Sequence, residues 1–256
     1  MLSIKHNRLN SLCAAIFVTL GLSQSLLAQE TSKNIEPRAE QLLQQMSKTL
    51  QNAREFTFQA EATRDEVSRT GQKIQYSTRT DVAVRRPNRL RADVEGDRVK
   101  RSFWYDGRSV TLLDRFENLY ATAAAPSAID DALDYAMEKF GVSAPLADLV
   151  FSNPYAVMTE NVKTGAYRGL NSVQGKSCHH LVFTQETIDW QICIENNQRS
   201  LPCKLVINYK KENATPQYTA ILTNWNLKPN LSDRQFTFVA PTNSKKIEFL
   251  PRVSNK

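Results

Sequence analysis

Glycine is scarce in this chain, with only eight among 256 residues. No glycines cluster into a loop of the kind that cradles phosphates, and the G-x-S-x-G turn of the α/β-hydrolases is missing. The H-E-x-x-H pattern of zinc peptidases is missing too. These absences favour a protein that is not an enzyme, and we expect no catalytic residues, no cofactor and no metal.

Long apolar runs are equally rare. One run, from about Leu12 to Leu22, follows Lys5 and Arg8 and leads through small or polar residues to Ala28. This layout is typical of a secretory signal peptide cleaved after Ala28. No later stretch approaches the roughly 20 apolar residues of a spanning helix. We therefore expect residues 1–28 to be removed and residues 29–256 to form one soluble, exported domain.

Charge of neither sign dominates. The chain has 33 basic and 26 acidic side chains, and loss of Lys5 and Arg8 lowers the first number to 31, a net charge of about +5. This excess suits an anionic membrane surface but is too small to indicate nucleic acid. Within RRPNRLRADVEGDRVKR, the candidates for docking lipid headgroups or an acidic partner are Arg85, Arg86, Arg89 and Arg91. The alternative is a solvated outer sheet face with charges that protect its edge.

Hydrophobic periodicity predicts both helices and strands in the first half of the chain. Residues 36–53 carry apolar side chains at helical spacing, with Pro37 in the first turn. Residues 55–122 instead alternate apolar and polar side chains between turn signals such as Asp106-Gly107. We expect an amphipathic helix followed by a series of antiparallel strands.

The pattern then changes to helices and returns to strands. Ser127 can cap a helix that ends at Gly141, and shorter helices are expected near Pro145 and after Pro154. From residue 163 to 239 the period of two returns, which predicts five or six more strands. Strands kept apart from helices along the chain indicate an α+β fold.

The stretch SCHHLVFTQETIDWQICI holds both histidines of the mature chain. His179 and His180 are adjacent on a predicted strand and therefore point to opposite faces, so they cannot share one metal ion. Folded as a hairpin through residues 184–187, the segment places Cys178 opposite Cys193, and a disulfide between them suits an oxidising compartment. A bond from Cys193 to Cys203 and three free thiols are the alternatives.

Several of these segments together resemble a known family. RRPNRLRADVEGD, FWYDGRSVTLLD, NLYATAAAPSAIDDALD, PLADLVFSNPY and CHHLVFTQETIDWQICIE follow one another as in the DUF2092 family of periplasmic bacterial proteins, which is similar to the lipoprotein-carrier (LolA-like) superfamily. The resemblance covers residues 39–239. It implies a strongly curved antiparallel β-sheet, an incomplete barrel, whose concave face is covered by an N-terminal helix and a helical insert. It implies no catalytic residues.

In such a fold the segments 128–141 and 145–152 are long enough to cover an apolar cavity. The candidates for its lining are Trp104, Tyr120, Leu133, Met137, Phe140, Leu149, Phe151, Trp190 and Trp225. For each of them the alternative is an ordinary dry core. We expect a periplasmic, non-enzymatic carrier of a lipid, acyl chain or lipoprotein, with peripheral contact to the membrane. One alternative function is an envelope-stress sensor or a module that binds an envelope protein on the same fold. A hydrolase whose site the motifs do not reveal is the other alternative.

Overall fold

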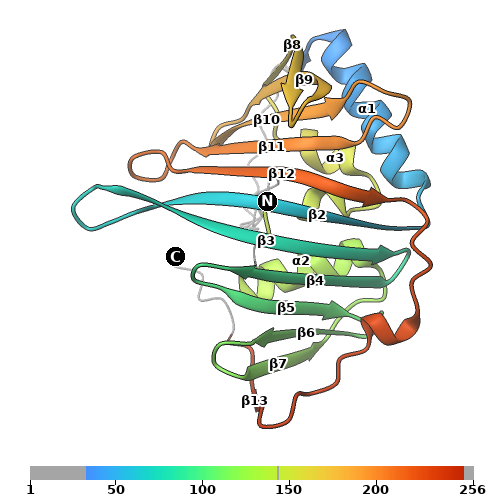
Figure 1. The fold of residues 1–256 in the computed structure, drawn as a ribbon, viewed down its shortest axis with the longest axis vertical. Helices are drawn as coiled ribbons and strands as arrows, with labels where there is room; N and C mark the ends of the chain where they lie inside the picture. The colour runs from blue at the N-terminus through green and yellow to red at the C-terminus, as the bar shows by residue number, and fades with distance from the viewer. Residues whose placement is uncertain (1–32, 143, 251–256) are drawn as a thin grey trace, which may run out of the picture.

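The computed structural model describes residues 33–142 and 144–250, which build one large curved sheet that does not close (Figure 1). In this described part of the chain the sheet has 13 strands, in the order β1-β8-β9-β10-β11-β12-β2-β3-β4-β5-β6-β7-β13. The predicted signal peptide, residues 1–28, lies outside the described residues.

Two antiparallel meanders form the sheet. The first comprises β2 (Glu55–Val67), β3 (Lys73–Arg85), β4 (Arg89–Gly96), β5 (Lys100–Tyr105), β6 (Ser109–Asp114) and β7 (Leu119–Ala124). The second comprises β8 (Thr164–Val173), β9 (Lys176–Thr184), β10 (Ile188–Glu195), β11 (Pro202–Tyr209) and β12 (Gln217–Asn226). Antiparallel pairing of β12 with β2 joins the two meanders into one sheet.

Two short parallel strands complete the edges of the sheet. β1 (Asn34–Ile35) pairs with β8, and β13 (Lys245–Ile247) pairs with β7. The sheet is therefore mixed, whereas we expected it to be entirely antiparallel. Both additions reach the sheet through long connections instead of hairpins, so no tight turn imposes antiparallel pairing on them.

The helices pack on one face of the sheet, here called the inner face (Figure 1). They are α1 (Pro37–Asn52), α2 (Ile129–Phe140) and α3 (Pro154–Thr159), together with the 3-10 turn η1 (Ala147–Leu149). A second 3-10 turn, η2 (Asp233–Phe236), lies beyond β12. The cap of α2 is Ala128 and not Ser127, and its side chain makes no capping hydrogen bond. Gly141 ends α2 in the left-handed conformation, as expected. The helix expected near Pro145 is only the turn η1.

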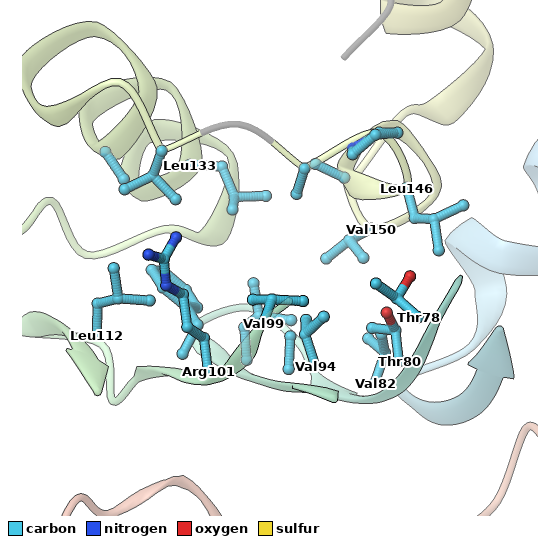
Figure 2. Close-up of a pocket in the computed structure, with 18 of the residues that line it drawn as sticks. Thr78, Thr80, Val82, Val94, Val99, Arg101, Leu112, Leu133, Leu146 and Val150 are labelled. Carbon is cyan, nitrogen blue, oxygen red and sulfur yellow. The ribbon is translucent and has the colours of Figure 1, made fainter. Parts of the chain in front are cut away.

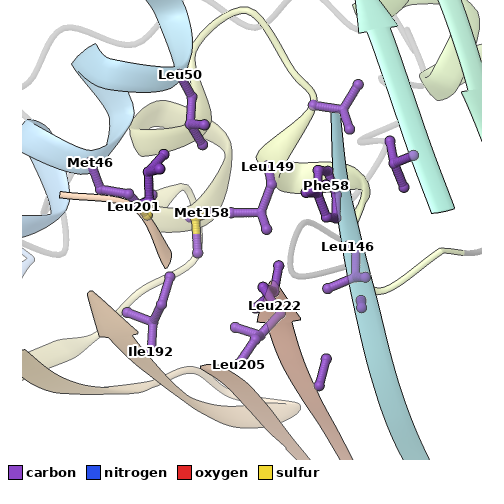
Figure 3. Packing of buried hydrophobic residues seen from close by; sticks show 14 of the residues in the cluster. Met46, Leu50, Phe58, Leu146, Leu149, Met158, Ile192, Leu201, Leu205 and Leu222 are labelled. Atoms are coloured by element: carbon purple, nitrogen blue, oxygen red, sulfur yellow. The ribbon is translucent and has the colours of Figure 1, made fainter. Parts of the chain in front are cut away.

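The main core lies between the helices and the inner face. Met46 and Leu50 of α1 face Ile192 of β10, while Leu149 packs towards Phe58 of β2 (Figure 3). Alternate side chains of a strand point into this core, so residues in the first half of β2 are half-buried and buried in turn. The sheet and the helices therefore share one continuous apolar interior.

The segment after β12 crosses the outer face of the sheet. Phe236 of η2 is fully buried there, and the Phe238 ring lies 5.1 Å from Trp104 and 5.0 Å from Tyr120 between ring centroids. Beyond β13 the chain comes back to α2, where Phe249 stacks on Phe140 with centroids 4.3 Å apart. The C-terminal segment thus wraps round the β7 edge and contacts both faces.

Candidate ligand-binding cavity

A cavity of about 510 Å³ lies between the sheet and the helical insert (Figure 2). This volume falls within the roughly 300–1,000 Å³ typical of small-molecule sites. The floor comes from β3, β4, β5, β6 and β12, and the roof from α2 and the segment after it. The lining residues are Thr78, Thr80, Val82, Leu90, Ala92, Val94, Val99, Arg101, Phe103, Leu112, Leu133, Ala136, Phe140, Gly141, Val142, Ala144, Pro145, Leu146, Ala147, Val150 and Tyr218.

The lining is apolar because of how the local sequence alternates. Val82, Leu90 and Phe103 occupy inward positions of three neighbouring strands. In the roof, Leu133 and Phe140 lie two helical turns apart and so share one face of α2. The cavity can therefore shield an apolar ligand from water.

The cavity is polar at one end and apolar at the other. Along β3 the inward residues change from half-buried Thr78 and Thr80 to buried Val82 and Val84. Along β5 they change from exposed Arg101 through half-buried Phe103 to Tyr105, which is 1% exposed. We call the end at Thr78 and Arg101 the mouth of the cavity. Solvent reaches the mouth, and the apolar end is closed by the core.

The start of the insert is fixed to the sheet by polar contacts. The backbone N–H of Ile129 donates to the carbonyl of Pro87 at 3.0 Å, and the Asp130 carboxylate accepts the Ser152 N–H at 2.9 Å. Arg86 donates to the Phe151 carbonyl at 2.8 Å and lies over the Phe56 ring. Burial lowers the pKa of Arg86. The N-terminal end of α2 is therefore anchored near the β3–β4 turn.

The structure distributes the nine predicted lining residues over four places. Leu133 and Phe140 line the cavity. Leu149, Phe151, Trp190 and Trp225 are buried at sites away from it, and Met137 is half-buried on α2 without lining it. Trp104 and Tyr120 lie on the outer face beneath Phe238. Strand alternation predicts which residues share a face of the sheet. It does not predict which face is the inner one, because a segment distant in sequence also covers apolar residues on the outer face.

The four predicted docking arginines all have partners within the chain. Arg85 pairs with Asp233, and Arg89 lies 4.0 Å from the same carboxylate. Arg91 binds Asp93 at 2.7 Å, and Arg86 is the buried anchor described above. The basic residue at the mouth is Arg101, which belongs to the same basic stretch but was not among the four candidates. A basic side chain in an inward strand position, two residues before Phe103, was the available signal.

The predicted hairpin register around the cysteines is wrong by two residues. Cys178 lies opposite Glu195, and Phe183 lies opposite Trp190, with ring centroids 4.0 Å apart. Cys178, Cys193 and Cys203, the three cysteines within the described residues, are free and buried on the outer face, and the Cys178 Sγ is 2.7 Å from the Cys203 Sγ. Burial raises the pKa of Cys193 to about 11. The nearest sulfur contact of Cys178 in the structure is therefore to Cys203 and not to the expected Cys193.

The two histidines point to opposite faces, as the sequence indicated. His179 Nδ1 lies 3.1 Å from the Tyr167 hydroxyl, and His180 Nε2 lies 2.9 Å from the Gln191 side-chain oxygen. Among the described residues, no group of three or more His, Cys, Asp or Glu side chains could hold a metal ion. No helix in residues 33–142 and 144–250 is long and apolar enough to cross a membrane.

A large curved, open sheet with helices on one face fits the LolA-like fold. The family model described as "Predicted periplasmic protein (DUF2092)" matches residues 39–250. The chain therefore belongs to the DUF2092 family, and the protein is periplasmic. This confirms the resemblance found in the sequence. Among curated proteins, none matches the chain.

Several solved structures are similar to this chain at low sequence identity. An uncharacterized conserved protein from Thermus thermophilus is 8% identical to this chain with a TM-score of 0.50, and the match covers 82% of this chain and 99% of that protein's chain. The Mycobacterium tuberculosis lipoprotein LppX is 12% identical with a TM-score of 0.46, covering 75% and 96%. The LolA superfamily protein NE2245 from Nitrosomonas europaea is 9% identical with a TM-score of 0.39, covering 78% and 97%.

Proposed function

We propose that this periplasmic protein is a non-enzymatic carrier that holds a lipid or acyl chain in the cavity between the sheet and α2. The observation that supports the proposal most is the apolar cavity of about 510 Å³, open at the Arg101 end and closed by the core at the other. Each Å² of apolar ligand surface buried there contributes about 25 cal/mol to binding. An acyl chain supplies such surface along its whole length.

The insert would act as the lid of this cavity. The N-terminal end of α2 is anchored through Ile129 and Asp130. The helix stops at Gly141, and Phe140 in its last turn contacts Phe249. A lid fixed at one end can open at the other without loss of its anchor. We expect the ligand to enter and leave as the C-terminal end of α2 moves, and transfer to involve a membrane or an envelope partner.

Native mass spectrometry of the protein purified from its own periplasm tests the proposal directly. We expect a lipid or fatty acid to co-purify. After its removal, the Ala92→Phe variant should bind a fluorescent fatty acid more weakly than the parent, because Ala92 lines the cavity. Ala124→Phe places the same ring at an exposed position of β7 and is the control. A parent protein that neither carries nor takes up any chain would refute the proposal.

A further inference from the structure

We propose that the ligand has an anionic head, a carboxylate or phosphate, which Arg101 binds at the mouth while the chain lies inside. This inference rests on the proposed carrier function and adds the class of ligand to it. Arg101 is a cationic residue among the lining residues, which are otherwise uncharged.

Arg101 is held in place from one side. It pairs across the sheet with Asp114 of β6, and its Nε donates to the Asp114 Oδ2 at 3.0 Å. The other oxygen of Asp114 accepts the N–H groups of Phe116 and Glu117 at 3.0 and 3.2 Å. Burial raises the pKa of Asp114, but the bonds from Arg101 and the two N–H groups outweigh it, so the pKa is lowered. The guanidinium therefore has a fixed, ionised anchor.

The terminal nitrogens of Arg101 remain available to a ligand. Asp114 engages Nε alone, and within the part of the chain that the structure describes neither Nη atom makes a hydrogen bond. Figure 2 shows the guanidinium rising from the strand into the space below α2, where Leu133 lies. Two parallel N–H groups match the two oxygens of a carboxylate or phosphate. The two Nη groups of Arg101 are therefore free to donate hydrogen bonds to both oxygens of a ligand's carboxylate or phosphate.

The position of Arg101 also sets the direction of the ligand. The side chain is 54% exposed, and the inward residues beyond it on β5, Phe103 and Tyr105, become progressively buried. A charged head is best left near water, and an apolar chain is best placed in the closed end. An anionic amphiphile satisfies both requirements in one orientation, with its head at Arg101 and its chain towards Leu90 and Leu133.

Calorimetric titration of the delipidated full-length protein with dodecanoate, dodecyl phosphate and dodecanol at pH 8 tests the inference. Arg101→Gln should weaken binding of the two anions roughly tenfold, the loss expected for a charge-assisted pair, and leave dodecanol unchanged. Arg79→Gln is the matched control, because Arg79 is 53% exposed, against 54% for Arg101, and pairs with Glu61 of β2 and Asp81 of β3 on the outer face of the sheet. That variant should bind all three ligands as the parent does.

Each result has a distinct meaning. A loss with dodecanoate alone, or with dodecyl phosphate alone, would support the inference and identify the head. If Arg101→Gln binds the anions as tightly as the parent, or weakens dodecanol by the same factor, the anionic-head inference is wrong while the carrier function stands. If the parent binds none of the three chains, the carrier function itself fails, and the inference that rests on it fails too.

Discussion

At the scale of single residues, the sulfur contact between Cys178 and Cys203 predicts which disulfide forms. With a Sγ–Sγ distance of 2.7 Å, the pair needs little movement to bond. Exchange with a protein disulfide of the periplasm would take two electrons and two protons from these thiols. Non-reducing peptide mapping should recover Cys178 joined to Cys203, with Cys193 alkylated only after denaturation. A peptide joining Cys178 to Cys193 would contradict this.

His179 predicts a pH dependence of stability. Burial and the nearby Arg38 charge lower its pKa, although a hydrogen bond with Asn196 opposes them. The folded state then binds a proton more weakly than the unfolded state, so the free energy of unfolding falls as pH drops through the ordinary histidine pKa of about 6.5. Urea unfolding should show lower stability at pH 5.5 than at pH 7.5, and the difference should shrink in His179→Gln. An equal difference in that variant would show that a group other than His179 causes the pH dependence.

The sequence could predict which residues share a face but not which partners they meet. The faces of His179, His180, Cys178 and Cys193 follow from strand alternation alone, whereas Cys203 joins the outer face through a bulge between β10 and β11. A slip of two residues keeps every side chain on its face, so the apolar pattern could not choose between Cys178 opposite Cys193 and Cys178 opposite Glu195. Stacking of Phe183 on Trp190 accompanies the observed register.

At the scale of elements, two leucines of the insert should differ in their contribution to stability. Leu149 of η1 is 1% exposed in the core, so Leu149→Ala should cost about 2–5 kcal/mol. Leu133 of α2 borders the cavity, and its truncation enlarges a space that is already open, so the cost should be smaller. Denaturant unfolding measures both, and fatty-acid uptake should change mainly in Leu133→Ala. Equal, full losses would indicate that α2 packs as core and not as a lid.

Stacking of Phe249 on Phe140 should slow the opening of the lid. An aromatic pair of this kind contributes about 0.5–1.5 kcal/mol, so Phe249→Ala should speed ligand release roughly 2- to 10-fold. The neighbouring Leu250 is 84% exposed and makes Leu250→Ala the control. Stopped-flow release of a fluorescent fatty acid measures the rate. An unchanged rate in Phe249→Ala would show that the C-terminal contact does not hold α2.

At the scale of the whole molecule, the regular elements could be predicted and the ends could not. The helix α1, the alternating strands and the end of α2 at Gly141 have strong local patterns. β1 and β13 have only two and three residues, too few for any periodicity, and their partners are far away in sequence. The cover that η2 and Phe238 give to the outer face could not be predicted for the same reason, and it explains why Trp104 and Tyr120 are shielded from solvent although they lie outside the cavity.

The pairing of β12 with β2 also determines the order in which the molecule can be completed. Thr57 pairs with Asn226, so the strand that starts the first meander acquires its second neighbour only when the last long strand has arrived. Until then β2 has an open edge that can pair with another chain. Because this contact spans most of the sequence, the joining of the two meanders should be a late and slow step of folding. In the periplasm, the newly exported protein would depend most on protection from aggregation during that interval.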